Sequence, residues 1–195
     1  MNNLIKRKIT ELSKVIFLIE KFSDKIDHSV FLIVESFNSN NKLLLCGNGG
    51  SAAEAQHIAA EYVSSLKHDF KRKSLPAIAL TTDTSFITAT GNDFGFDTIF
   101  ERQIESLGNK GDVLIAITTS GNSENVIRAA KIAKEKGLKV IGLTGISGGK
   151  LKDYCDVLFN VPSENTMRIQ EIHLFLEHTI CEGVENKLFA KNIYR

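Results

Sequence analysis

The sequence predicts an α/β protein built as a three-layer sandwich, in which helices cover both faces of a five-stranded parallel sheet. From residue 42 onward, short apolar runs alternate with helical patterns, which is the order expected of parallel strands joined by crossover helices. Runs such as 113–117 (VLIAI) are apolar throughout, as strands buried on both faces of a sheet require. Segments rich in glycine and hydroxyl residues follow the first, third and fourth runs, so they should gather at the edge of the sheet where such folds bind ligands.

The individual elements follow in order along the chain. Residues 3–38 carry two amphipathic helices, because apolar residues recur at helical spacing from Ile5 to Ile19 and again from Ile26 to Phe37. Strands are predicted at 42–46, 76–80, 112–117, 139–143 and 156–161. Helices are predicted at 51–66, 84–91, 98–107, 123–136 and 165–188. We find no internal repeat or linker, so residues 1–195 are interpreted as one domain, with an N-terminal helical part at 1–39 and an α/β core at 40–188.

Composition excludes several classes of function. The 195 residues are 43% hydrophobic and 24% charged with a formal net charge of +1, so neither nucleic acid nor an anionic membrane is an expected partner. The N-terminus lacks the pattern of a signal peptide, and no apolar run approaches the roughly 20 residues of a membrane span. The three cysteines form no C-x-x-C pair, which favours a reducing cytoplasm. The basic run 71–73 is predicted to be a solvated loop.

The first functional motif joins a predicted strand to a predicted helix. The turn GNGG at 47–50 permits close backbone approach, and Ser51 stands where a helix N-cap is expected. Backbone amides and the positive end of a helix dipole then converge on a place where an anion can bind. Further along, His57 and Glu61 are four residues apart and share one helix face, although such pairs also occur on solvated faces. The motif favours an enzyme that acts on a phosphorylated substrate.

Two nucleotide-binding interpretations fit poorly. Gly47, Gly49 and Ala52 satisfy the spacing of a dinucleotide fingerprint, but the acidic residue expected about 20 positions later falls before the next strand begins. The segment 145–150 has some features of a P-loop, yet its spacing is wrong and Leu151 stands where Ser or Thr would bind magnesium.

A second hydroxyl-rich segment, TTSGNS at 118–123, also joins a strand end to a helix start. Its hydroxyls and amides at a helix N-terminus are suited to holding a phosphate without a cation. The alternative is ordinary helix capping by Ser123. A single capping serine does not need such a cluster, so we favour ligand binding.

The C-terminal helix is apolar but carries the polar run RIQEIH from residue 168. Gln170 and His178 are eight residues apart, about 80° around the helix, so both can border one site. His173 and His178 are about 140° apart, so one of these two histidines is expected to be structural.

Taken together, GNGGSAAEAQHIAAE, LTTDTSFITATGNDFGF, TTSGNSENV and RIQEIH resemble the phosphoheptose isomerases of the sugar isomerase (SIS) superfamily, over roughly residues 40–180. The resemblance implies a flavodoxin-like SIS fold and a cytoplasmic homotetramer whose sites are built from more than one subunit. It also implies conversion of sedoheptulose 7-phosphate to D-glycero-D-manno-heptose 7-phosphate, toward the heptose of lipopolysaccharide or capsules.

The resemblance assigns roles to individual residues. Substrate-binding residues, chiefly for the phosphate, would be Asn48, Gly49, Gly50, Ser51, Thr118, Thr119, Ser120 and Ser123. Asn92 and Asp93 would border the sugar, and Glu61 and Gln170 would also contact it. One zinc ion per subunit would be held by His57, Glu61, Gln170 and His178. Glu61 would be the catalytic base and His178 the catalytic acid.

Three departures from the family pattern stand out. The family commonly has Gly-Arg and an aromatic residue where this chain has Ser-Ser-Leu at 64–66, so Lys67 or Arg72 would have to supply any contact made by the missing arginine. Met167 replaces a small residue or proline, and Thr118 replaces the usual serine.

Two rival functions stay open at this level, and one further expectation concerns assembly. The rivals are a non-catalytic SIS-domain regulator that binds the bacterial replication initiator, and an isomerase of another phosphosugar. The apolar stripes of the first two helices, with Ile16, Ile19 and Ile33, are wider than a covering layer needs and predict self-association.

Overall fold

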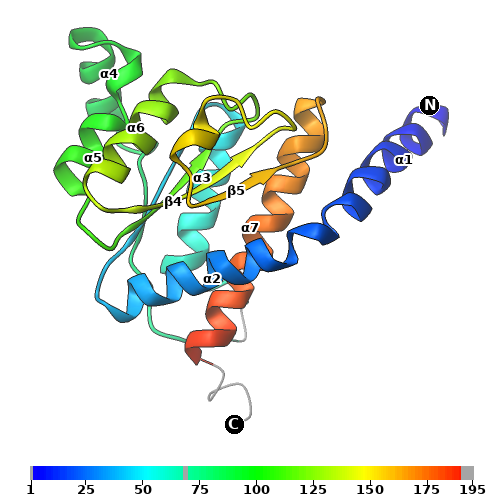
Figure 1. Ribbon diagram of the computed structural model, residues 1–195, viewed down its shortest axis with the longest axis horizontal. Helices are drawn as coiled ribbons and strands as arrows, with labels where there is room; N and C mark the ends of the chain where they lie inside the picture. Colours follow the sequence, from blue (N-terminus) through cyan, green and yellow to red (C-terminus); the bar gives the residue numbers. More distant parts are fainter. Residues whose placement is uncertain (1, 68–69, 190–195) are drawn as a thin grey trace.

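The protein, described here by a computed structural model over residues 2–67 and 70–189, has the predicted three-layer α/β architecture (Figure 1). Its five strands are parallel and lie in the order β2-β1-β3-β4-β5. They are β1 Leu43–Gly47, β2 Ala77–Ala79, β3 Val113–Ile117, β4 Lys139–Thr144 and β5 Val157–Asn160. All five predicted strands are confirmed.

The helices also follow the prediction, with differences at their ends. They are α1 Asn2–Leu18, α2 Ser23–Asn38, α3 Gly50–Val63, α4 Thr84–Asp93, α5 Glu101–Leu107, α6 Glu124–Glu135 and α7 Thr166–Phe189. Helix α5 begins at Glu101 rather than at 98, because Phe96–Thr98 form a separate 3₁₀ turn after Gly95, whose φ is +93°. Helix α3 ends at Val63 rather than at 66, where the backbone leaves the helix at Ser64.

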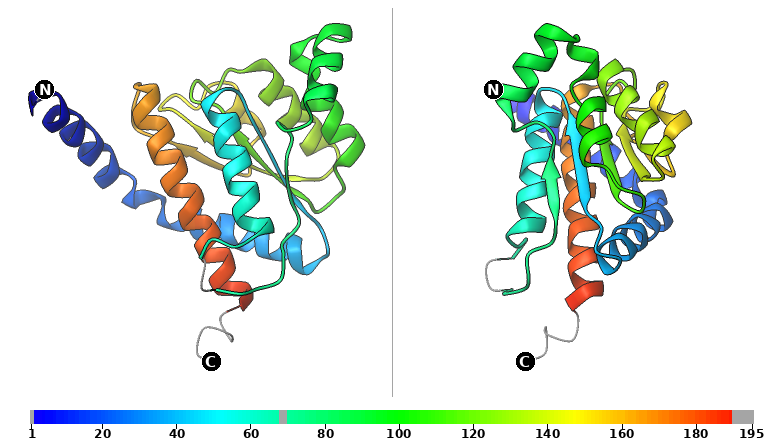
Figure 2. Two further views of the ribbon diagram at one scale, coloured as in Figure 1. Left: turned by 180° about the vertical axis from the view of Figure 1, so that it is seen from behind. Right: turned by 90° about the vertical axis from the view of Figure 1, so that its left-hand side faces the viewer.

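Successive strand residues point to opposite faces of the sheet, and both faces are covered. Leu43 and Leu45 of β1 belong to the core beneath α2, α3 and α7. Leu44 and Cys46 belong to the core beneath α5 and α6. This two-sided burial explains why the strands are apolar throughout, and Figure 2 shows the helices on both sides of the sheet.

Helices α3 and α7 both begin near the carboxyl edge of the sheet and run beside each other, so residues at corresponding depths on the two helices can meet (Figures 1 and 2). Helix α1 extends away from the body beyond the short 3₁₀ turn Glu20–Phe22 (Figure 1). None of the helices in the described part of the chain combines the length and apolar character that crossing a membrane requires.

Candidate active site

The start of α3 is set by glycine rather than by a serine cap. Gly49 is the N-cap residue with φ +57°, a conformation that favours glycine, and the helix begins at Gly50. The predicted N-cap role of Ser51 is therefore wrong, because Gly49 already occupies the N-cap position. Ser51 instead lies buried in the first turn of the helix. The backbone N–H of Ser51 donates to the carbonyl of Asn48, at 3.0 Å.

The loops after β1 and β3 are joined through a pair of amide side chains. Asn48 and Asn125 donate to each other's carbonyl oxygens, both at 2.9 Å. Asn125 is buried in the first turn of α6. The pair places the GNGG turn beside the hydroxyl-rich segment at 118–123, so two of the predicted ligand-binding segments are neighbours.

The hydroxyls of the second segment form a cluster of their own. Thr118 Oγ1 lies 2.9 Å from Ser123 Oγ and 3.3 Å from Ser120 Oγ. Ser123 occupies the N-cap position of α6, but its side chain makes no capping hydrogen bond. The capping alternative therefore leaves this hydroxyl unexplained, because Ser123 is turned toward Thr118 instead.

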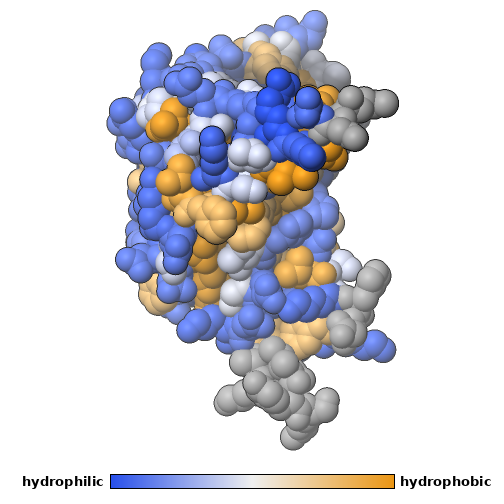
Figure 3. All heavy atoms as spheres, turned by 90° about the vertical axis from the view of Figure 1, so that its right-hand side faces the viewer, coloured by the Kyte–Doolittle hydropathy of each residue, from blue (hydrophilic) through white to orange (hydrophobic). Residues whose placement is uncertain are grey.

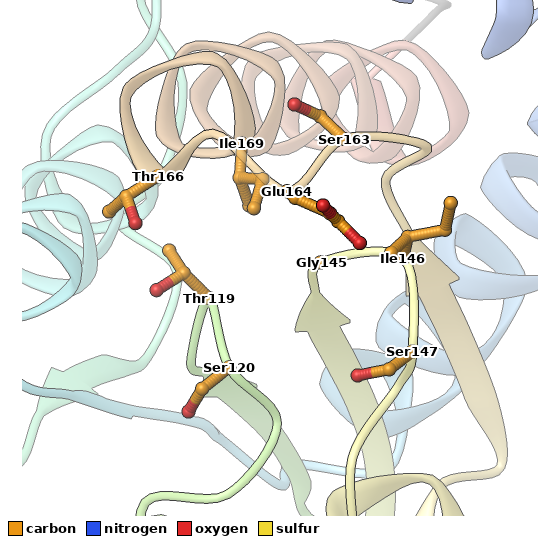
Figure 4. A pocket seen from close by; sticks show the side chains of 9 residues that line it. All are labelled: Thr119, Ser120, Gly145, Ile146, Ser147, Ser163, Glu164, Thr166 and Ile169. Carbon is orange, nitrogen blue, oxygen red and sulfur yellow. The ribbon is translucent and has the colours of Figure 1, made fainter.

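A pocket of about 260 Å³ opens beside this cluster at the carboxyl edge of the sheet (Figure 4). Thr119 and Ser120, both predicted site residues, line one side of it. The other side is formed by the loop after β4, the segment before α7 and the start of α7 itself, with lining residues Gly145, Ile146, Ser147, Ser163, Glu164, Thr166 and Ile169. Sequence reasoning noted the glycine-rich segment at 145–150 but assigned no site role to any of these side chains.

Two loops of this region interlock through glycines. A Cβ on Gly121 would run into the backbone of Gly148 and Gly149, and a Cβ on Gly149 would run into the backbone of Gly121. Both Gly121 and Gly149 have positive φ, +69° and +53°. The amide of Leu151 donates to the carbonyl of Gly121 at 3.0 Å, and the amide of Lys150 donates to Asn122 Oδ1 at 3.1 Å. The loop after β4 therefore fixes the shape of the loop after β3.

His57, Glu61 and His178 meet where α3 packs against α7. His57 Nε2 lies 2.9 Å from His178 Nε2 and 3.6 Å from Glu61 Oε1. In the part of the chain that the structure describes, these three side chains could hold a metal ion, because their donor atoms all lie within 4.8 Å of one another. Two imidazoles and one carboxylate are a donor set that suits a divalent transition metal and leaves room for other ligands.

Gln170 lies closer to the N-terminus of α7 than His178 does, and it packs against the start of α3. A Cβ on Gly50 would run into its side-chain amide, so the absence of a side chain at Gly50 lets the two helices approach here. Gln170 precedes His178 by eight residues, which is about 12 Å of helix rise. Its membership in the metal-binding set stays a prediction.

Burial lowers the pKa of His178 below its usual value, and the neighbouring His57 ring lowers it further while Glu61 opposes the change. The neutral form of His178 is therefore favoured. A neutral imidazole can carry a proton on one nitrogen and accept one on the other, as proton transfer at a reacting centre requires.

The interface between α3 and α7, called here the α3–α7 seam, also encloses a buried polar cluster that the sequence did not indicate. Glu54 of α3 faces His173 and Glu177 of α7, and the His173 Nδ1–Glu54 Oε2 distance is 3.9 Å. Burial raises the pKa of Glu54 to about 7 and that of Glu177 well above its usual value, while burial lowers the pKa of His173 to about 4. The His173 ring is thus neutral, and its Nε2 donates to the carbonyl of Thr144 at 3.1 Å. His173 is the structural histidine that helical geometry predicted.

Asn92 and Asp93 stand apart from these groups. They end α4, are exposed, and hydrogen-bond to each other at 2.8 Å. Helix α4 lies at one corner of the molecule, far from α7 (Figures 1 and 2). Within the described single chain, then, the predicted sugar-bordering pair does not reach the α3–α7 seam.

The basic run 71–73 is not simply a solvated loop, because the side chain of Arg72 is fully buried, although Lys71 and Lys73 are exposed. Its guanidinium pairs with Glu185 of α7, and both side chains are almost completely excluded from solvent. Arg72 is therefore unavailable to replace the missing family arginine near Ser65. Met167 is half-exposed at the start of α7 and does not line the pocket.

Comparison with known proteins decides the family. A family model described as SIS domain matches residues 7–145. The phosphoheptose isomerase of Aliarcobacter butzleri is 50% identical over 185 residues, which is 95% of this chain and 97% of that protein. The chain belongs to the phosphoheptose isomerase family.

Solved structures of this family agree with the fold. The phosphoheptose isomerase from Neisseria gonorrhoeae superimposes with a TM-score of 0.89 at 43% identity, covering 95% of this chain and 98% of that one. The phosphoheptose isomerase from Francisella tularensis gives 0.90 at 36% identity, with 94% and 97% covered. The predicted family and SIS fold are thus confirmed.

Proposed function

We propose that this phosphoheptose isomerase family member converts sedoheptulose 7-phosphate to D-glycero-D-manno-heptose 7-phosphate, an aldose–ketose isomerisation. The observation that carries the proposal is near full-length identity of 50% to a phosphoheptose isomerase in a chain that gathers His57, Glu61 and His178 at one seam. Retention of these three groups argues against a non-catalytic regulator, because phosphosugar binding alone needs no such proton-transferring set.

The phosphate is assigned to the carboxyl edge of the sheet. The hydroxyls of Ser51, Thr118, Thr119, Ser120 and Ser123, with the amides of Gly49 and Gly50, would surround it. Support comes from the pocket beside Thr119 and Ser120 and from the Ser123 hydroxyl that is not used as a cap. Neutral donors at a helix N-terminus are suited to a dianion, because the helix dipole adds to their hydrogen bonds.

Isomerisation moves one proton between two carbons and one between two oxygens. In our assignment Glu61 removes a proton from C1 of the ketose, forming a cis-enediol, and returns it to C2. His178 moves the hydroxyl proton from O1 to O2, so that the carbonyl passes from C2 to C1 and no atom is gained or lost. Support for these roles is the mutual placement of the two side chains with His57.

A zinc ion is the proposed cofactor, one per subunit, held by His57, Glu61 and His178 with Gln170 as a fourth ligand. When bound, such an ion would polarise the substrate carbonyl and orient the diol. Glu61 would then serve both the metal and the substrate, and a carboxylate held by a metal is a weaker base.

The direct test is to incubate the purified protein, with and without zinc, with sedoheptulose 7-phosphate and to look for the aldose by NMR. We expect an aldose signal that Glu61→Gln abolishes. Failure of the wild-type protein to produce aldose under either condition would rule the proposal out. Turnover of a different ketose phosphate instead would favour the isomerase of another phosphosugar.

Assembly into a homotetramer is part of the proposal, and the first helix supports it. Ile19 and Ile33, which were expected to leave apolar surface exposed, are buried within the single chain. Ile16 is exposed as expected, and further exposed apolar side chains lie along α1 and its end, at Leu4, Ile5, Ile9, Phe17 and Leu18. Figure 3, which looks at the side of the molecule that carries α1 in Figure 1, shows apolar patches among hydrophilic ones. Residues 1–39 would bury such surface between subunits.

A tetramer would also give Asn92 and Asp93 a role, as groups that reach the sugar of a neighbouring subunit's site. Light scattering at micromolar concentration should give four times the chain mass of 21.6 kDa. A monomeric mass would refute the assembly. We place the enzyme in the cytoplasm, supplying heptose phosphate for lipopolysaccharide or capsule synthesis, with no nucleic acid or membrane partner.

A further inference from the structure

The far end of α3 is held by a buried ion pair that lies outside the candidate site. Arg72 Nε and Glu185 Oε1 are 2.5 Å apart, and their side chains are 0% and 3% exposed. A buried pair of this kind is costly to form, because two charges must leave water. Its position therefore calls for an explanation beyond general stability.

Two further bonds of the guanidinium go to the last turn of α3, and a third goes to the carbonyl of the adjacent Lys73, at 2.9 Å. Arg72 Nη2 donates to the backbone carbonyl of Glu61 at 2.7 Å, and Nη1 donates to the carbonyl of Tyr62 at 2.9 Å. These are carbonyls near a helix C-terminus, where few intrahelical partners are available. Arg72 thus holds the backbone of the proposed catalytic base itself.

Glu185 connects the same point to α7 and to the chain that leaves α3. Its Oε1 also accepts from the backbone N–H of Leu66 at 3.1 Å. Glu185 follows His178 by seven residues, so the two lie on the same face of α7 about 10 Å apart along the helix. One carboxylate and one guanidinium therefore join the backbone at Glu61 to the face of α7 that carries His178.

From this arrangement we infer that Arg72 is a positioning residue for catalysis: through the Glu61 carbonyl and Glu185, it sets the register between Glu61 on α3 and His178 on α7. The inference rests on the proposed function of Glu61 and His178. The fork of an arginine suits the task, because its three nitrogens reach a carboxylate and three backbone carbonyls at once, whereas a lysine offers one compact ammonium. Small displacements of a catalytic group lower rates steeply, so a change in this register should lower kcat.

Arg72→Lys is the first test, since it keeps the charge beside Glu185 but loses the fork. We expect kcat with sedoheptulose 7-phosphate to fall about tenfold or more while KM changes less than about twofold. The matched control is Glu182→Gln, which breaks the exposed Lys67–Glu182 pair between the same segment and α7. The control should leave both constants near those of the wild-type protein. An Arg72→Lys protein with wild-type kcat would overturn the inference.

A second variant separates positioning from stability. In Arg72→Leu/Glu185→Leu, an apolar pair replaces the buried ion pair, an exchange that other proteins often tolerate. If the double variant has a Tm closer to the wild-type value than that of Arg72→Lys while its kcat stays low, the register explanation holds. If kcat recovers together with Tm, the ion pair only stabilises the fold and the inference is wrong.

A third readout does not depend on activity. Nitrogen-15 chemical shifts of the His57 and His178 rings, measured at one pH in metal-free protein, report their 2.9 Å contact. We expect both to move in Arg72→Lys and neither to move in Glu182→Gln. A wild-type protein that is inactive on the substrate would defeat the proposed function, yet the shifts would still report the register. Ring shifts that stay unchanged in Arg72→Lys, whatever the rate, would overturn the inference.

Discussion

Glu54→Gln should make folding stability less sensitive to alkaline pH, because Glu54 is buried against Glu177 and His173 of α7. Burial raises its pKa from 4.5 to about 7, while a hydrogen bond from Ser51 on its own helix opposes the rise. Between these two values the folded protein holds a proton that the unfolded chain has lost, so stability falls as pH rises through the window. The shift corresponds to about 3 kcal/mol, reached in full above pH 7.

The change is measured by urea unfolding at about pH 5.5 and 8.5, without metal. The penalty that Glu54 imposes on the free energy of unfolding should grow from about 1 kcal/mol at the lower pH to about 3 kcal/mol at the higher. Gln at position 54 cannot ionise. The free energy of unfolding of Glu54→Gln, relative to that of the wild-type protein, should therefore rise by about 2 kcal/mol between the lower and the higher pH. Effects of the substitution on packing cancel, since they are present at both pH values.

His173 is neutral at both pH values, because its pKa is about 4, and Glu177 stays protonated well above the usual range of a carboxyl group. Glu124→Gln, on the exposed face of α6, is the control and should follow the wild-type protein at both pH values. An equal stability difference between Glu54→Gln and wild type at pH 5.5 and 8.5 would refute the argument.

Three further predictions concern the proposed site. Glu61→Gln and His178→Gln should each lower kcat by about 10²-fold or more with an unchanged circular dichroism spectrum, since each replaces a proton-carrying side chain by a glutamine of similar size. Near-normal turnover in either variant would show that the roles are misassigned. Ser120→Ala should raise KM about tenfold through one lost hydrogen bond to the phosphate, and inorganic phosphate should compete with substrate in the wild-type protein; a sugar phosphate found remote from Ser120 in a soaked crystal would contradict this. Zinc should raise Tm more in mildly alkaline than in mildly acidic buffer, because a ligating imidazole must be unprotonated, and His57→Ala should erase the difference; a Tm that does not respond to zinc at either pH would rule out a metal at this seam.

The order of the elements, and the gathering of the glycine- and hydroxyl-rich loops at the carboxyl edge of the sheet, were predictable from the sequence, because they depend on local patterns. Apolar runs such as 113–117 have no solvated face, so a two-sided sheet follows from composition alone. The i,i+4 spacing of His57 and Glu61 likewise places both on one face of α3, and the structure brings them to His178 as helical geometry allows.

The burial of charged side chains could not be predicted from the sequence, because it depends on partners far along the chain. Arg72 looks like one of three solvated basic residues, and its burial depends on Glu185, 113 positions away. Glu54 lies in an ordinary polar position of α3, and only the packing of α7 encloses it with Glu177. The Ser51 cap failed for a local reason, because a glycine with positive φ can begin a helix two residues earlier.

The interlocked glycines also bear on how this scaffold can change its ligand. Since Gly121 and Gly149 each occupy the space that the other's side chain would need, neither position can acquire a side chain unless the opposing loop moves as well. Two segments almost thirty residues apart in the sequence therefore form one mechanical unit at the carboxyl edge of the sheet. Adaptation to a different phosphosugar should instead be concentrated on side chains outside these two loops, such as the half-exposed Met167 at the start of α7, which can vary singly without disturbing them.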